Sequence, residues 1–148
     1  MAQFYPPVGF HFKVEVLGLD SGGNDSRFSE VSGLSVETVT EEYAEGGENR
    51  FAQKYPGISR YPELILKRGM QVSSALADWV SKSIREGDIK PRNIDVMLLN
   101  QSHEPLVTWH LVNAYPTKWT MSDFNANQNE IVVETLQMYY QYFTIDKS

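Results

Sequence analysis

The stretch EEYAEGGENRFAQKYPGISRYPELILKRG (Glu41–Gly69) decides how the chain is organised. It begins as a glutamate-rich strand, meets a pair of glycines, and crosses a long run of aromatic and basic residues before a second expected strand, ELILKRG. Gly46 and Gly47 can adopt backbone angles that turn the chain out of a sheet. A loop of this length inside a small protein is usually functional, so its chemistry is the main clue in the sequence.

The length, composition and net charge are those of an ordinary folded protein. The 148 residues predict a single domain over residues 1–148, because folding at this length removes roughly 68–70% of the unfolded chain's surface. A content of 41% hydrophobic and 22% charged residues is typical of a globular protein. The net charge of -6 argues against general attraction to nucleic acid or an anionic membrane, and we find no specific nucleic-acid motif.

Several classes of site and of targeting signal are missing. The chain has no cysteine, which excludes disulfides, thiolate metal sites and thiol nucleophiles. No basic segment leads into an apolar run at the N-terminus, and no stretch approaches the ~18 apolar residues of a membrane span. We therefore expect synthesis in the cytoplasm and no membrane segment.

Most of the chain has the pattern of β-strands. In FHFKVEV (Phe10–Val16) the apolar residues alternate with polar ones, which predicts a strand with one buried face. FSEVSGLSVETVTEEY predicts a long, bent strand with a bulge at Gly33. The expected strands after Phe10–Val16 are Phe28–Tyr43, Glu63–Gly69, Asn93–Asn100, Pro105–Tyr115 and Glu130–Ile145.

A single helix is expected from Val72 to about Glu86. Its apolar stripe places Leu76, Trp79 and Val80 in the core. Ser73 or Ser74 can cap its start and Gly87 suits its end. The fold class is therefore mainly β with one α-helix, as an antiparallel β-barrel or sandwich.

No pattern in the sequence indicates catalysis. His11, His103 and His110 lack the spacing of metal ligands. The run GGENRFAQK contains glycines and a lysine but not the GK[ST] ending of a phosphate-binding loop. The glutamates near the end of the Phe28–Tyr43 strand are typical of a solvated face. We expect no catalytic residue, no metal and no cofactor.

Charge is ordered along the chain. The ionised residues between Phe28 and Asn49 are all acidic, whereas those between Arg50 and Arg68 are basic with the exception of Glu63. Complementary patches on different parts of one subunit allow head-to-tail contacts, which close into rings or continue as filaments. The alternative interpretation is a flexible surface loop whose charge order is accidental.

Several segments together resemble a known family. They are YPPVGFHFKVEV, FSEVSGLSVETVTEEYAEGGENRFAQKYPG, YPELILKRG with the Trp-containing helix after it, NAYPTKW and NEIVVETLQM. In this order they are similar to the inner tube proteins of contractile injection systems. That family includes contractile phage tail tubes, pyocin-type tubes and antifeeding-prophage-like machines, and the haemolysin-coregulated protein of type VI secretion shares its fold. The resemblance covers nearly the whole chain.

The resemblance implies a structural protein. It implies rings of six subunits whose strands join in one barrel, with the helix on the outer side, and rings stacked into a hollow tube. A surrounding sheath contracts and drives the tube through a target envelope. The implied partners are other copies of the chain, the sheath protein, baseplate or tip and terminator proteins, and lumenal cargo, either protein effectors or DNA. The implied location is a phage tail or tail-like particle, released from the cell or anchored to a membrane through its baseplate.

The resemblance also suggests roles for single residues. The long loop would reach neighbouring subunits and the adjacent ring, which gives as inter-subunit residues Gly46, Gly47, Glu48, Asn49, Arg50, Lys54, Tyr55 and Arg60. One polar strand face would line the lumen, with candidates Ser35, Glu37, Glu41, Thr135 and Gln137. That assignment assumes that Leu34, Val36, Leu136 and Met138 point into the core. These candidates predict a mainly acidic lining.

Two other classes of function remain as alternatives. A stand-alone β-barrel could hold a small ligand between its strands, but it would need a roomier interior than the Leu, Val, Met and Trp content suggests. An enzyme of unknown type is the third interpretation. The sequence leaves open whether the system is a phage or a toxin-delivery machine, and whether the chain forms the main tube or the initiating ring.

Overall fold

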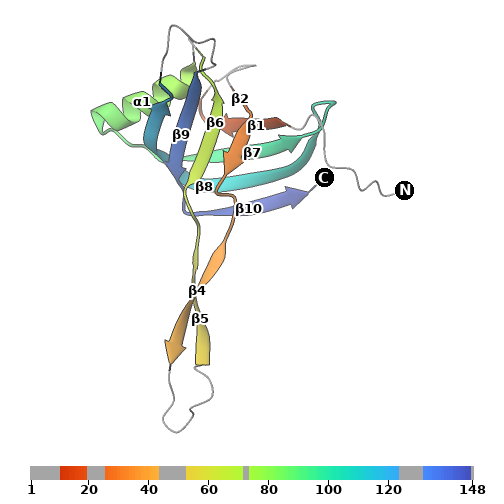
Figure 1. Ribbon diagram of the computed structural model, residues 1–148, viewed down its shortest axis with the longest axis vertical. Coiled ribbons are helices and arrows are strands. Elements are labelled where there is room, and N and C mark those ends of the chain that lie inside the picture. The colour runs from red at the N-terminus through yellow and green to blue at the C-terminus, as the bar shows by residue number, and fades with distance from the viewer. Residues whose placement is uncertain (1–10, 20–25, 44–52, 72–73, 124–131, 148) are drawn as a thin grey trace.

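The protein is built almost entirely from antiparallel strands (Figure 1). The computed structural model describes residues 11–19, 26–43, 53–71, 74–123 and 132–147. Its elements are β1 (His11–Val16), β2 (Arg27–Phe28), β3 (Glu30–Ser32), β4 (Glu37–Tyr43), β5 (Gln53–Arg60), β6 (Leu64–Gly69), α1 (Ala75–Glu86), β7 (Arg92–Leu99), β8 (Pro105–Met121), β9 (Val133–Tyr139) and β10 (Tyr142–Lys147). The predicted fold class, mainly β with one helix, is confirmed. No helix in the described part of the chain has both the length and the apolar character required to cross a membrane.

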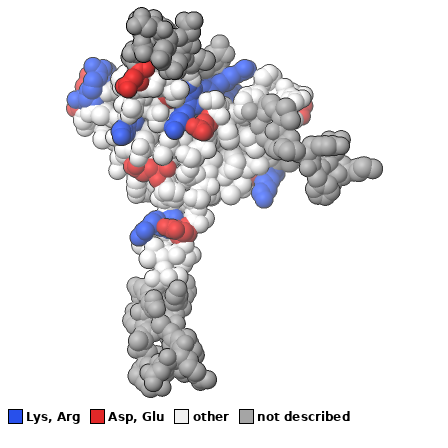
Figure 2. Space-filling view, viewed as in Figure 1, with Lys and Arg blue, Asp and Glu red and all other residues white. Residues whose placement is uncertain are grey.

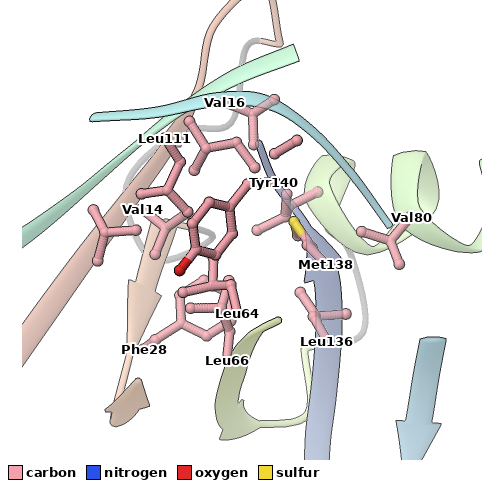
Figure 3. Packing of buried hydrophobic residues seen from close by; sticks show 14 residues of the cluster. Val14, Val16, Phe28, Leu64, Leu66, Val80, Leu111, Leu136, Met138 and Tyr140 are labelled. Atoms are coloured by element: carbon pink, nitrogen blue, oxygen red, sulfur yellow. The ribbon is translucent and has the colours of Figure 1, made fainter. Parts of the chain in front are cut away.

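One sheet folds over on itself to enclose the core. Its strand order is β2-β1-β7-β8-β9-β6-β3, and β10 also pairs with β8. The long strand β8 links the two parts, because its first half lies between β7 and β10 while its second half pairs with β9. Figure 3 shows Tyr140 at the centre of the cluster, among Val14 of β1, Leu64 of β6, Leu111 of β8 and Met138 of β9.

The predicted strand Glu130–Ile145 is two strands. Both β9 and β10 run along β8, with Tyr139 opposite Tyr115 and Tyr142 opposite Val112. The chain leaves the ladder between them, and Tyr140, which is only 2% exposed, turns into the core. The prediction of one continuous strand was wrong because the pairing with β8 is interrupted beside Asn113, where the backbone of β8 has φ +52°.

The predicted strand Phe28–Tyr43 is also interrupted. It becomes β2, β3 and β4, and β3 pairs with β6 whereas β4 pairs with β5. Gly33 has φ +93°, and a Cβ there would clash with the carbonyl oxygen of Glu63. The chain therefore passes too close to its neighbour for any residue but glycine, and Gly33 ends a strand rather than forming a bulge within one.

The helix begins and ends largely as its capping residues predict. The Oγ of Ser74 accepts a hydrogen bond from the backbone N–H of Ala77 at 2.9 Å, and Gly87 closes the helix with φ 69°. Leu76 and Val80 are fully buried, whereas Trp79 is half-buried against the core. The predicted start at Val72 lies outside the described residues, and the helix itself begins at Ala75.

A buried ion pair attaches the helix to the sheet. Arg68 of β6 and Glu134 of β9 are 3% and 0% exposed, and Arg68 Nε donates to Glu134 Oε2 at 3.2 Å. Arg68 Nη2 also donates to the cap residue Ser74 at 2.8 Å, and Trp119 Nε1 donates to the other oxygen of Glu134 at 2.9 Å. Charges buried in this way are tolerated only when further hydrogen bonds satisfy them.

Glu134→Gln should destabilise the fold strongly. The change removes the carboxylate charge that pairs with the buried guanidinium of Arg68, which costs about 3–5 kcal/mol of unfolding free energy. Urea denaturation would measure the loss. The matched control is Glu30→Gln, which removes an exposed pair with Lys67 at 3.8 Å and should cost less than about 1 kcal/mol. Equal losses in the two variants would contradict the role given to the buried pair.

Candidate functional site

A two-stranded arm projects from the body (Figure 1). It consists of β4 and β5, which pair with each other in a sheet of their own. Glu37 lies opposite Arg60 and Glu42 opposite Lys54. The expectation of a loop running through to Arg60 was wrong, because residues 53–60 form a strand that pairs with the acidic segment before the glycines.

The Pro56-Gly57 pair is the reason why no strand was predicted here. Proline and glycine together usually mark a turn. Here proline is tolerated because each strand of a two-stranded sheet has a free edge. Gly57 lies beside an irregularity between Thr38 and Thr40, where a Cβ would approach the carbonyl oxygen of Val39 to 2.5 Å. The pair therefore accommodates a bulge rather than a turn.

The ordered charges meet inside the arm. Arg60 Nη1 lies 3.8 Å from Glu37 Oε1, and both side chains are about two-thirds exposed. In Figure 2 basic and acidic atoms lie together where the arm leaves the body. Cross-strand pairs of opposite charge favour a hairpin, so at these two residues the charge order serves pairing within one copy.

The arm leaves apolar side chains uncovered. Ile58 is 78% exposed and Val36 50% exposed. A two-stranded sheet is marginally stable alone, and exposed apolar groups of this kind favour contact with another surface. The arm therefore has the character of an element that is completed by a second molecule.

Three aromatic rings hold the root of the arm. Tyr61, directly after β5, meets Tyr140 and Phe143 edge-on at centroid distances of 5.8 and 5.2 Å. The hydroxyl of Tyr140 donates to the carbonyl oxygen of Gly33 at 2.7 Å, just before the chain enters β4. Burial, with a smaller effect of Tyr61, raises the pKa of Tyr140 to about 12, so its hydroxyl keeps the proton that it donates. Both chain segments of the root are thus anchored near Tyr140.

A polar depression lies on the outer face of β3, β6, β8 and β9. Its volume is about 530 Å³, and it is lined by Glu30, Val31, Ser32, Ile65, Lys67, Lys118, Thr120, Thr135 and Gln137. Lys67 lies 3.8 Å from Glu30, and Gln137 donates to Glu63. The face therefore carries both signs of charge, whereas the sequence predicted an acidic lining.

The structure separates the residues that were predicted to line one face. Thr135 and Gln137 lie on the depression, but Glu37 belongs to the arm and Ser35 is exposed in the segment before it. The side chain of Glu41 lies outside the described residues. Leu136 and Met138 are buried as assumed, and Leu34 packs against the core. Val36 is half-exposed, so that assumption was wrong, because the chain has already left the body there.

The predicted inter-subunit residues that the structure describes belong to the arm. The stretch from Gly46 to Arg50 falls outside the described residues. Lys54 and Tyr55 belong to β5, but their side chains are not described, and Arg60 pairs with Glu37. The sequence analysis missed Ile58, whose isolated position in a polar stretch gave no periodic signal.

A carboxylate–imidazole cluster lies on the other half of the sheet. The two ring nitrogens of His110 lie 2.7 Å from oxygens of Asp95 and Asp146. Hydrogen bonds to Asp95 and then to Asp146 raise the pKa of His110 against the opposing effect of burial. Among the described residues no group of three or more His, Asp or Glu could hold a metal ion. The fully buried side chains that fill the core give no support to a ligand-binding barrel.

Comparison with known proteins gives consistent matches over almost the whole chain. Residues 8–144 match a family model described as T4-like virus tail tube protein gp19. A chain in the baseplate of the anti-feeding prophage is 26% identical with a TM-score of 0.81, over 99% of this chain and 98% of that chain. A chain in the extended sheath-tube complex of the extracellular contractile injection system PVC is 30% identical with a TM-score of 0.75, over 98% and 94%.

More distant structures share the fold alone. A type six secretion system protein is 12% identical with a TM-score of 0.68, over 94% of this chain and 84% of that chain. A search of curated proteins found no match.

Tyr140→Phe should weaken the root of the arm. The change removes the hydrogen bond to Gly33 and leaves that carbonyl oxygen short of a partner, which costs about 1–2 kcal/mol of unfolding free energy. The control is Tyr139→Phe, since the Tyr139 side chain is 41% exposed on the opposite face of the strand. Urea denaturation of both variants tests this, and a Tyr140 loss no larger than that of Tyr139 would argue against the anchoring role.

Proposed function

The chain belongs to the T4-like virus tail tube protein family and is a structural tube subunit. On this premise we propose that six copies join into a ring and that rings stack into the hollow inner tube of a contractile injection system. The observation that carries the proposal is the arm, an unsupported hairpin with Ile58 uncovered. A structural element of this kind gains its stability from a neighbouring copy. We assign the chain no catalytic role.

Free strand edges support closure into a ring. In the described part of the chain, β3 ends the sheet on one side, and β8 beyond Ala114 pairs with β9 alone. Strand edges with unpaired backbone groups favour pairing with another chain, and a closed barrel removes them. We place β3 of one copy beside the second half of β8 in the next, which turns the polar depression toward the lumen.

The lumen face suits passage rather than binding. Thr120, Thr135 and Gln137 keep it wetted, and Lys67 and Lys118 balance Glu30 and Glu63. A charge-balanced wall neither holds nor strongly repels a charged passenger. The cargo in this proposal is protein effectors or DNA.

The arm is the contact between copies and between rings. The residues proposed for assembly come from the sequence between β4 and β5 and from the start of β5, namely Gly46, Gly47, Glu48, Asn49, Arg50, Lys54 and Tyr55. Contacts between different patches of identical subunits are head-to-tail, so each copy both gives and receives an arm. The apolar side chain of Ile58 would become buried in this contact.

The further partners follow from the relatives. Similar chains occur in structures of an anti-feeding prophage baseplate and of its tube-terminating cap, and in a sheath-tube complex. We propose that this chain likewise contacts a sheath protein, a baseplate or tip and a terminator. It would be made in the cytoplasm and incorporated into a phage tail or tail-like particle.

Electron microscopy of native particles tests the proposed function directly. We expect stacked rings with six-fold symmetry along the particle axis. Purified protein should form the same rings, at least when assembly is nucleated. A chain that stays monomeric at high concentration and in the lysate of cells that make the complete particle would refute the proposal.

Ile58→Ser should weaken assembly without affecting the monomer. The side chain is 78% exposed, so its loss removes almost no burial within one copy. Burying it against a neighbour contributes about 1.5–3 kcal/mol per contact, so the concentration needed for polymerisation should rise at least tenfold. Sedimentation of polymer measures this. Ile89→Ser, at a 43% exposed position away from the arm, serves as the control. Polymerisation of the Ile58 variant at the wild-type concentration would argue against the contact.

A further inference from the structure

The C-terminal strand β10 is weakly attached to the body. In the described part of the chain it pairs with β8 alone, from Tyr142 opposite Val112 to Lys147 opposite Val107. Phe143 is half-buried, and the other side chains of the strand are exposed. A strand with so little burial opens locally at low free energy unless other contacts hold it.

The half-buried side chain of β10 contacts the root of the arm. The ring of Phe143 meets that of Tyr61 edge-on at 5.2 Å, and Tyr61 directly follows the last residue of β5. Tyr140, which bonds to Gly33 at the other side of the root, lies 6.1 Å from Phe143 between centroids. The place of β10 on the body therefore determines how firmly the arm is held.

A cluster of three side chains fixes β10 to the sheet. His110 of β8 lies between Asp95 of β7 and Asp146 of β10, with 2.7 Å to each. A neutral imidazole has one N–H and can donate to only one carboxylate, so both contacts require the protonated ring. The same two carboxylates hold the pKa of His110 above its ordinary value.

The surrounding charges leave this arrangement in place. Beyond Asp95 lies Glu15 of β1, which is paired with Lys13 at 2.9 Å. Thr144 of β10 lies opposite His110, and the cation Lys147 lies farther along β10. Asp95 and Asp146 are therefore the carboxylates that face the ring from the neighbouring strands.

We propose that β10 is a strap that secures the root of the arm, and that protonated His110 fastens this strap through Asp146. The consequence for assembly rests on the proposed function, in which the arm joins one copy to another. Because the folded-state pKa of His110 is raised, the fastening is complete below the ordinary value and is lost as pH rises through the folded value. Assembly should therefore be favoured at mildly acidic pH.

Hydrogen exchange of the monomer tests the fastening. From about pH 6 to about pH 9, protection of the amides in residues 142–147, corrected for intrinsic rates, should fall about tenfold. Asp146→Ala should reduce protection at both pH values. Asp146→Asn should flatten the profile, because its amide N–H can donate to the neutral ring. Asp88→Asn, which removes an exposed carboxylate 4.0 Å from Lys90, should behave as the wild type. A wild-type profile in both Asp146 variants would overturn the fastening.

A second measurement tests the connection to the arm. Phe143→Ala leaves His110 and its partners in place, so it should lower the protection of residues 57–61 while the pH dependence of residues 142–147 remains. Asp146→Ala should also lower protection at 57–61 and raise the concentration needed for polymerisation several-fold. If the protection of residues 142–147 is lost while that of residues 57–61 is unchanged, the proposal that β10 secures the root of the arm is wrong. If the wild type forms no rings at either pH even when assembly is nucleated, the proposed function fails, while the exchange data still decide the strap.

Discussion

A hairpin of two strands has no core of its own, and this constraint governs the structure outside the body. Among the described residues the two strands of the arm pair only with each other, so the direction of the arm is set where it joins the body. There the ring of Tyr61 packs edge-on against Tyr140 and Phe143, and the Tyr140 hydroxyl fixes Gly33 on the entering chain. Edge-on aromatic contacts contribute energy beyond their buried area and restrict orientation. A projecting element can take part in a repeated contact only if its base is fixed in this way.

The body supplies the rigid support for that base. Arg68 and Glu134 connect β6 and β9, and through Ser74 they reach the start of α1. A buried ion pair is poor evidence of stability in itself, but its geometry is demanding, because each lost partner leaves a buried charge. The helix, the two strands and Trp119 are therefore held in one relative arrangement. The polar depression on the outer side of the same strands has its shape fixed by the same network.

The sequence predicts the body better than it predicts the arm. Alternating apolar residues in β1 and the capping residues Ser74 and Gly87 are local signals, and the structure follows them. The arm was taken for a loop because Pro56 and Gly57 imitate a turn, whereas a bulge opposite Val39 accommodates them. The interruption between β9 and β10 at Tyr140 depends on contacts with strands that are distant in the sequence, and a local sequence pattern does not show such contacts. The Asp95–His110–Asp146 cluster also joins three strands that are far apart in the sequence.

The pairing of charges within the arm changes the account of how copies associate. Glu37 and Arg60 already form an ion pair within one copy, so replacing this pair by a pair with a residue of another copy would change the free energy little. Ile58 is 78% exposed in the described part of the copy, and its burial would be a gain without a matching loss. In the proposed assembly, apolar contact therefore supplies the driving force, while the ordered charges restrict which surfaces can approach. An arm that is fixed at its root by aromatic rings and leaves the apolar side chain of Ile58 uncovered is suited to a contact that many identical subunits repeat.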